Sequence, residues 1–158
     1  MIGFPRVVNE KAARTVAGGV ALTAAVALVT GAQWLLIPLA LGFWARVLSG
    51  PRLSPLALLA TRVVAPRLGA PKDVPGPPKR FAQGIGAALT TAGSAAVLLG
   101  WGGVASGALA ALLVAATLES AFALCLGCEI FGVLMRAGIV PETVCLECAD
   151  IGRRLQRA

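Results

Sequence analysis

Two long stretches without a charged side chain constrain the fold of this chain more than any other feature. They cover residues 15–45 and 81–118, and every Lys and Arg lies before, between or after them. Of the 158 residues, 58% are apolar and 13% are charged, and the mean hydropathy is +0.84. These values are typical of a membrane protein rather than a soluble domain. We therefore expect both stretches to lie in a lipid bilayer.

Each uncharged stretch contains turn-forming glycine near its middle, Gly31 in the first and Gly102 in the second. A transmembrane helix needs about 20 apolar residues, so the first pair of helices is short and crosses only if Arg14 and Arg46 reach back to the membrane surface. We predict an all-α, multispan helical membrane protein, a single domain with four transmembrane helices that form two hairpins. The spans are expected at residues 12–30, 33–48, 81–101 and 104–124.

A basic loop over residues 49–80 connects the two hairpins and carries six Lys or Arg against one acid. Ser54 is a suitable helix cap and Pro55 a suitable first residue, so the loop is expected to begin with a short helix. This cytoplasmic helix lies on the membrane surface or, alternatively, caps the bundle. The proline-rich residues 70–80 that follow predict an extended linker.

Positive charge is distributed asymmetrically along the chain. It gathers before the first span, in the middle loop and in the C-terminal tail, whereas the two short turns carry no charge. Because loops rich in Lys and Arg stay in the cytoplasm, both termini are predicted to be cytoplasmic. The net charge of +7 then reflects membrane topology, so we expect the lipid bilayer as a partner and no nucleic acid.

The two halves of the chain share a faint sequence repeat. Arg14 is followed by TVAGGVALT and Arg80 by FAQGIGAALT, and residues 5–14 match residues 71–80 in length and in their end residues. A parallel duplication about an axis along the membrane normal would produce this pattern. Chance similarity between helices rich in Ala and Gly is the alternative.

The cysteines form two Cys-x-x-Cys pairs that are separated by 16 residues: Cys125, Cys128, Cys145 and Cys148. We expect the fourth helix to continue through the first pair to Gly138. A tail helix from Pro141 would then fold back, making a four-cysteine hairpin over residues 125–158 with a C-terminal cytoplasmic helix and with the two pairs facing each other. Because a helix start stabilises a thiolate, Cys145 suits redox chemistry better than Cys125 at a helix end.

The spacing of the cysteines fits two kinds of chemistry. Histidine and tyrosine are absent, so catalysis must rely on cysteine or carboxylate. In a reducing cytoplasm, four thiols serve transient redox exchange or metal binding better than permanent disulfides. One hypothesis makes all four cysteines catalytic in thiol–disulfide or sulfur-relay chemistry. The other makes them ligands of a structural zinc, or less readily iron, in a non-enzymatic membrane scaffold.

Two charged residues are predicted to lie within the membrane. Glu119 falls inside the fourth span, where a carboxylate is costly and usually paired, and Arg46 lies at a similar depth in the second span. We predict an ion pair between them, and a small transporter that uses Glu119 and Arg46 is a third functional hypothesis. Glu129, next to Cys128, is expected at the surface or beside the cysteine site.

Three motifs together, RFAQGIG, CLGCEIFGVLMR and Pro-Glu-x-Val-Cys-x-x-Cys, resemble a bacterial family of small membrane proteins, domain of unknown function 4395. The resemblance covers nearly the whole chain, and CLGCE with the trailing Cys-x-x-Cys is its most specific part. It implies a multispan protein of the bacterial inner (plasma) membrane, of a kind often encoded beside thioredoxin-like or sulfurtransferase proteins. A thioredoxin-like or sulfurtransferase protein is therefore the expected partner. The resemblance names no substrate and leaves homo-oligomer formation open.

Overall fold

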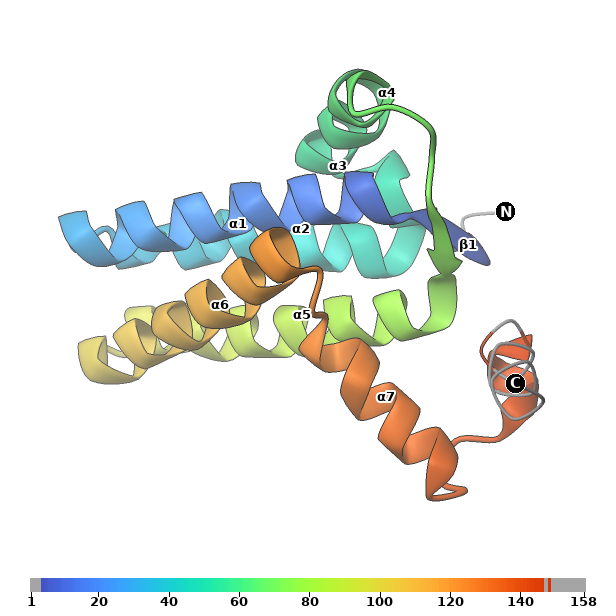
Figure 1. Ribbon diagram of the computed structural model, residues 1–158. Coiled ribbons are helices and arrows are strands. Elements are labelled where there is room, and N and C mark those ends of the chain that lie inside the picture. The colour runs from blue at the N-terminus through green and yellow to red at the C-terminus, as the bar shows by residue number, and fades with distance from the viewer. Residues whose placement is uncertain (1–3, 147, 149–158) are drawn as a thin grey trace.

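The computed structural model of the protein describes residues 4–146 and 148. This part of the chain is mostly helical, and four of its helical segments are long and apolar enough to cross a membrane (Figure 1). The second of them, Gln33–Arg67, contains several shorter elements. The elements are β1 (Val7–Asn9), α1 (Glu10–Thr30), α2 (Leu36–Ser49), α3 (Pro55–Leu59), α4 (Ala65–Arg67), β2 (Asp73–Pro75), α5 (Gly76–Leu98), α6 (Gly102–Phe122) and α7 (Leu126–Arg136).

The long helices turn large apolar side chains outward along their length. Among the most exposed are Leu22, Val29, Leu41 and Leu98. Exposing this apolar surface to water costs free energy, whereas contact with lipid tails does not. A helix also satisfies its own backbone hydrogen bonds, as a span in hydrocarbon must. The composition and the exposure of the four helices together suit a membrane protein.

The helices pack around a core of small and branched side chains. α1 makes its broadest contact with α6, and α2 with α5, while α5 also packs on α6. Leu36, Phe43 and Leu109 are the larger members of this core, and alanines such as Ala24 and Ala105 let the backbones approach closely. Each half of the chain therefore packs mainly on the other half, and the predicted arrangement as two separate hairpins is not confirmed.

A two-stranded antiparallel sheet lies at one end of the bundle. β1 pairs with β2 so that Val8 is opposite Val74. The all-α prediction missed this sheet, because a strand of three residues is too short to leave a periodic signal in the sequence. The sheet joins the segments that lead into α1 and α5, and thus fixes the starts of these two helices next to each other.

The sheet relates the two halves of the chain by an approximate two-fold axis. Val8 and Val74 are separated by the same interval as Arg14 and Arg80, so equivalent valines face each other at its centre. Each half runs through a strand and two longer helices and then through shorter helical segments, α3 and α4 in the first half and α7 in the second. The same two-fold exchanges the contact of α1 with α6 for that of α5 with α2. A duplication about an axis along the bundle predicts this arrangement.

α5 begins earlier than the sequence indicates. The extended linker expected at residues 70–80 is wrong beyond β2, because α5 starts at Gly76 and has Pro77 and Pro78 in its first turn. Proline suits this turn, since the first helical N–H groups have no intrahelical partner. Gly76 is needed, because a Cβ there would overlap the carbonyl oxygen of Pro5. Lys79 therefore lies on a helix and not in the loop.

The short helix expected after Ser54 is present as α3, with Pro55 at its first position. Ala57 is buried in the core of the bundle, and Leu56 lies directly against Gly19 of α1. Figure 1 shows α3 and α4 above α1, towards the end of the bundle that also carries the sheet and α7. α3, α4, the sheet and α7 thus gather towards one end of the four long helices.

Gly86 marks a close approach between α2 and α5. A Cβ at Gly86 would overlap the Phe43 ring, whereas a Cβ at Gly84 of the same helix would meet no atom within 4 Å. We expect Gly86→Ala to destabilise the protein by about 1–3 kcal/mol through overpacking. Gly84→Ala should leave stability unchanged or raise it. Thermal unfolding in detergent, followed by circular dichroism, measures both, and an equal Tm for the two variants would contradict this packing.

Candidate disulfide site

The chain turns sharply between α6 and α7. Ala123, directly after α6, has a positive φ of 58°, and the Leu124 N–H donates to the Leu118 carbonyl oxygen at 3.1 Å. The helix thus ends at a left-handed residue, a position that glycine usually occupies. The prediction that the fourth helix continues through Cys125 to Gly138 is therefore wrong.

The first cysteine pair lies at the N-terminus of the new helix, α7. Cys125 is the N-cap residue, and its Sγ accepts a hydrogen bond from the Cys128 N–H at 3.3 Å. The two sulfurs form a disulfide, in which Cys125 is buried and Cys128 is half-buried. The partial positive charge of a helix N-terminus favours negative charge on the N-cap sulfur. Cys125 thus lies at a helix start, the position that was predicted for Cys145, and not at a helix end.

A close backbone contact fixes this disulfide against α5. Gly127, inside the Cys-x-x-Cys loop, packs so tightly that a Cβ would lie 2.5 Å from the Cα of Ala82. Farther along α7, the rings of Phe131 and Phe81 form a tilted pair with centroids 5.6 Å apart. α7 is therefore attached to α5 by a glycine contact and an aromatic contact, and the disulfide lies at the glycine contact.

The second cysteine pair repeats the local geometry of the first. Cys145 and Cys148 form a disulfide, and the Cys148 N–H donates to the Cys145 Sγ at 3.3 Å. Cys145 is fully buried and follows a 3-10 turn at Glu142–Val144. The C-terminal helix expected from the sequence falls mainly on residues 147 and 149–158, which lie outside the described residues.

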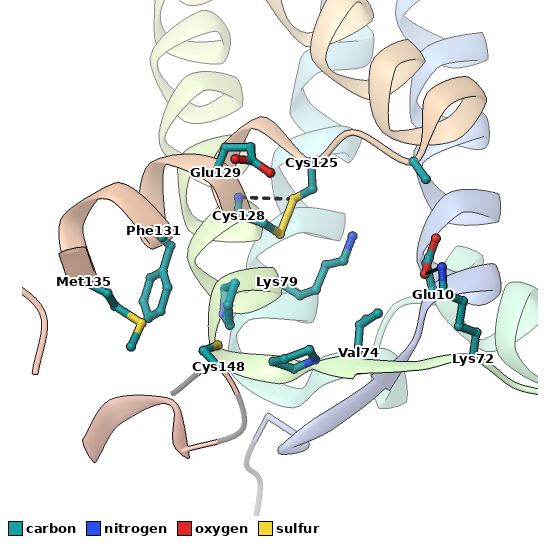
Figure 2. A pocket seen from close by; sticks show the side chains of 14 residues that line it. Glu10, Lys72, Val74, Lys79, Cys125, Cys128, Glu129, Phe131, Met135 and Cys148 are labelled. Carbon is teal, nitrogen blue, oxygen red and sulfur yellow. Dashed lines mark hydrogen bonds and ion pairs between the residues drawn. A yellow bond between two sulfur atoms is a disulfide. The ribbon is translucent and has the colours of Figure 1, made fainter. Parts of the chain in front are cut away.

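Both pairs border one cavity of about 400 Å³ at the end of the bundle (Figure 2). Cys125, Cys128 and Cys148 line it, together with Lys79 and Glu129. Glu129 is exposed in the first turn of α7 and lies beside Cys128 in Figure 2. The structure thus brings the two pairs to one cavity, but as two local disulfides and not as four facing thiols.

The disulfide state bears on the zinc hypothesis. A zinc or iron site of this type needs thiolate ligands, and sulfurs in a disulfide bond cannot supply them. Within residues 4–146 and 148, no three His, Cys, Asp or Glu side chains are grouped so as to hold a metal ion. A zinc site with four cysteine ligands would require reduction of both pairs, and it stays a prediction for the reduced protein.

Glu119 has a different partner from the one predicted. Its carboxylate accepts a hydrogen bond from the Lys79 ammonium at 2.6 Å, and both side chains are largely buried. Arg46 instead donates from Nε to Gln83 at 2.8 Å and from Nη1 to Ser54 at 3.3 Å. The predicted Glu119–Arg46 ion pair is therefore wrong, although both residues line one cavity inside the bundle. Their use in a transporter stays a prediction.

Lys79 is a site residue that the sequence analysis missed. It is buried, pairs with Glu119, and lines the cavity beside the first disulfide. The assignment of residues 70–80 to an extended linker placed it outside the bundle. Gly-Pro-Pro at residues 76–78 is a helix-start signal that would have placed Lys79 in the beginning of α5.

Peptide mapping under non-reducing conditions tests the two local disulfides. Trypsin cleaves after Arg80, Arg136 and Arg153, so it separates the first pair from the second. For protein purified without reductant, we expect each peptide to carry one internal disulfide and no free thiol, because the sulfurs of each pair are already joined. Two peptides linked to each other, or free thiols with bound zinc, would contradict this arrangement.

The contact of Gly127 with Ala82 predicts how well the first disulfide is protected. We expect Gly127→Ala to push α7 off α5, so that dithiothreitol reduces Cys125–Cys128 about tenfold faster, which corresponds to about 1.4 kcal/mol of lost packing. Gly132→Ala on the same helix is the control, because its Cβ would approach no closer than 3.8 Å to the end of the Arg136 side chain. Alkylation with iodoacetamide after timed reduction measures the rates. Equal rates in all three proteins would show that the contact does not protect the disulfide.

Comparison with known proteins gives one match. No curated protein and no solved structure matches the chain. The family model Domain of unknown function (DUF4395) matches residues 8–136, a range that contains the four long helices, α7 and the first cysteine pair but not the second. The resemblance stated from the sequence motifs is confirmed, and the chain belongs to the DUF4395 family.

Proposed function

We propose that this protein is a membrane-anchored thiol–disulfide exchange protein that passes electrons to or from a soluble thioredoxin-like protein. The observation that carries the proposal is the position of the Cys125–Cys128 disulfide, at the N-terminus of α7 and in the wall of a cavity that also reaches Cys148. A helix N-terminus stabilises the thiolate that exchange releases. The apolar outer surface of the four long helices supplies the anchor.

The two sulfurs of the first pair have different roles in this exchange. Cys128 is the more exposed residue of the pair, so a thiolate of the partner attacks its Sγ. The Cys125–Cys128 bond breaks, and the electron pair leaves on the Cys125 Sγ, which the Cys128 N–H and the helix N-terminus stabilise. The second thiol of the partner, once deprotonated, then displaces Cys128 from the mixed disulfide. The partner loses two electrons and two protons, and Cys125 and Cys128 gain them as thiols.

The second pair extends the exchange to a relay. Cys148 lines the same cavity as Cys128, and Cys145 is buried behind it with the same N–H contact to its sulfur. In each pair the first cysteine is the stabilised leaving group and the second is the sulfur open to attack. The partner can therefore enter at either pair. When it reduces Cys145–Cys148 first, the Cys148 thiolate attacks the Cys128 Sγ, and Cys145 then displaces Cys128, so the electrons move toward the bundle while the Cys145–Cys148 disulfide forms again.

The partner approaches from the cytoplasm in this proposal. The sheet, the loop that contains α3 and α4, and α7 lie toward one end of the bundle (Figure 1), and this loop carries the exposed Arg52, Arg62 and Arg67. Loops rich in Arg stay on the cytoplasmic side of a bacterial inner membrane. In that reducing compartment the disulfides are transient intermediates, as a catalytic pair requires.

A thioredoxin that lacks its resolving cysteine tests the proposal. When its remaining thiolate attacks a disulfide of the purified protein, the mixed disulfide cannot be resolved, so we expect a covalent adduct. Non-reducing electrophoresis detects the adduct, and tryptic mapping should place it on Cys128 or Cys148.

The control is a Cys128→Ser, Cys148→Ser double variant, which has no disulfide left for thioredoxin to attack. It should give no adduct, while the Gly132→Ala variant, whose disulfides are intact, should react like the wild type. A wild-type protein that forms no adduct, or an adduct that forms equally on the double variant, would contradict the exchange function.

A further inference from the structure

A second cavity lies inside the bundle, directly behind the first disulfide. It has a volume of about 290 Å³, and its walls come from α1, α2, α5, α6 and the start of α7. Most of its lining is apolar, with Ala, Val, Leu, Ile and Phe side chains, and its polar side chains are Arg46, Gln83 and Glu119. A small, largely apolar pocket with a few polar groups is the usual form of a ligand site. We call it the inner cavity and the one in Figure 2 the outer cavity.

Arg46 supplies a buried donor that lacks an acceptor. Its side chain is 5% exposed, its guanidinium lies over the Phe43 ring at 4.4 Å, and Nε and Nη1 donate to Gln83 and Ser54. Among the described residues, no group accepts a hydrogen bond from Nη2. A buried cationic donor without a partner is costly. A ligand with an acceptor oxygen would remove that cost.

The inner cavity opens to the lipid-facing side of the bundle. Four of its lining residues are exposed and all four are apolar: Ile85, Ala111, Leu126 and Ile130. Arg46 also lines a neighbouring cavity of about 240 Å³ near β1 and the basic loop, but that cavity does not reach a cysteine. The apolar rim favours a ligand that arrives from the bilayer.

Cys125 lies in the wall between the inner and the outer cavity, because it lines both. The Lys79–Glu119 ion pair forms another part of this wall, with Lys79 on the outer side and Glu119 on the inner side. A ligand in the inner cavity can therefore reach Cys125 without contact with the soluble partner. This ligand needs a ring small enough for the cavity, an acceptor oxygen for Arg46, and the capacity to exchange electrons with a dithiol.

We infer that the inner cavity binds the head group of a membrane quinone, which reoxidises the Cys125–Cys128 dithiol. This inference rests on the exchange function proposed above and supplies its membrane-side oxidant. Cys125 and Cys128 form their disulfide and release two electrons and two protons, and the two quinone carbonyl oxygens take them up to give the quinol. Arg46 is a positioning residue, since its Nη2 donates to one carbonyl oxygen. The quinone tail leaves through the apolar rim into the lipid.

The test uses the full-length protein in nanodiscs, reduced beforehand and freed of reductant. Decylubiquinone is the probe, and its absorbance change is followed together with the loss of thiols. We expect one quinone to be reduced for each Cys125–Cys128 disulfide formed. Ala115→Leu, on the cavity wall, should abolish the reaction, whereas Ala110→Leu, which is exposed on the same helix and lines no described cavity, should match the wild type.

Substitutions at Arg46 distinguish a positioning role from a purely structural one, because they should change the quinone concentration for half-maximal rate and leave the thioredoxin adduct unchanged. Arg46→Gln should raise the quinone concentration for half-maximal rate by about tenfold or more, because one charged hydrogen bond is lost. Arg46→Lys should recover part of this loss. Both variants should still form the thioredoxin adduct, since Arg46 does not line the outer cavity.

The outcomes separate this inference from the exchange function. A wild-type protein that forms the thioredoxin adduct but reduces no quinone would overturn the quinone site and leave the exchange function in place. Quinone reduction without the adduct would overturn the soluble partner instead. Equal quinone reduction by wild type and Ala115→Leu would overturn the cavity assignment. The cavity assignment would also be overturned if phosphatidylglycerol co-purified with the wild type and were lost from Arg46→Gln, because a lipid head group would then be the acceptor for Arg46.

Discussion

The missing side chain of Gly127 is the constraint on which the site depends. It lets the loop between the first two cysteines lie on the backbone of Ala82, where any larger residue would collide. The turn at Ala123 points the chain in this direction, and the Phe131–Phe81 contact holds α7 there. Because α7 starts at this contact, Cys125 becomes an N-cap residue, and the disulfide is held at the end of the bundle rather than on a loop.

This position gives the disulfide two different environments. The half-buried Cys128 and the Cys148 of the second pair line the outer cavity with polar neighbours, whereas Cys125 also borders the apolar inner cavity. The Lys79–Glu119 pair closes the same boundary with two charges that neutralise each other. A buried ion pair contributes little net stability compared with apolar packing, so this pair is better understood as part of the boundary between the two cavities than as a source of stability.

Much of the fold could be predicted from the sequence, and the exceptions have physical reasons. The four long apolar helices follow from the length of the uncharged stretches. The turn of the chain before Cys125 cannot be predicted in this way. Apolar residues continue from α6 into α7, and a single residue in the left-handed conformation, Ala123, leaves no periodic signal in the sequence. Counting rise per residue placed Arg46 and Glu119 at similar depth, and both do line the inner cavity. It could not show which helix faces carry them, so Glu119 and Arg46 were paired with each other. Lys79, the actual partner of Glu119, was missed because residues 70–80 were assigned to a linker outside the bundle.

The two-fold relation between the halves has a consequence for how such a chain can acquire a function. A half-length version would leave β1 without a neighbour and α1 without α6, so it would be complete only when two copies assemble. When the two halves are joined in one polypeptide, they are free to diverge in sequence. The N-cap residue of α3 is Ser54, whose hydroxyl accepts a hydrogen bond from Arg46. The N-cap residue of α7 is Cys125, which forms the disulfide. Two identical subunits would have to place the same residue at both caps, whereas a single gene can assign the cation to one and the sulfur to the other.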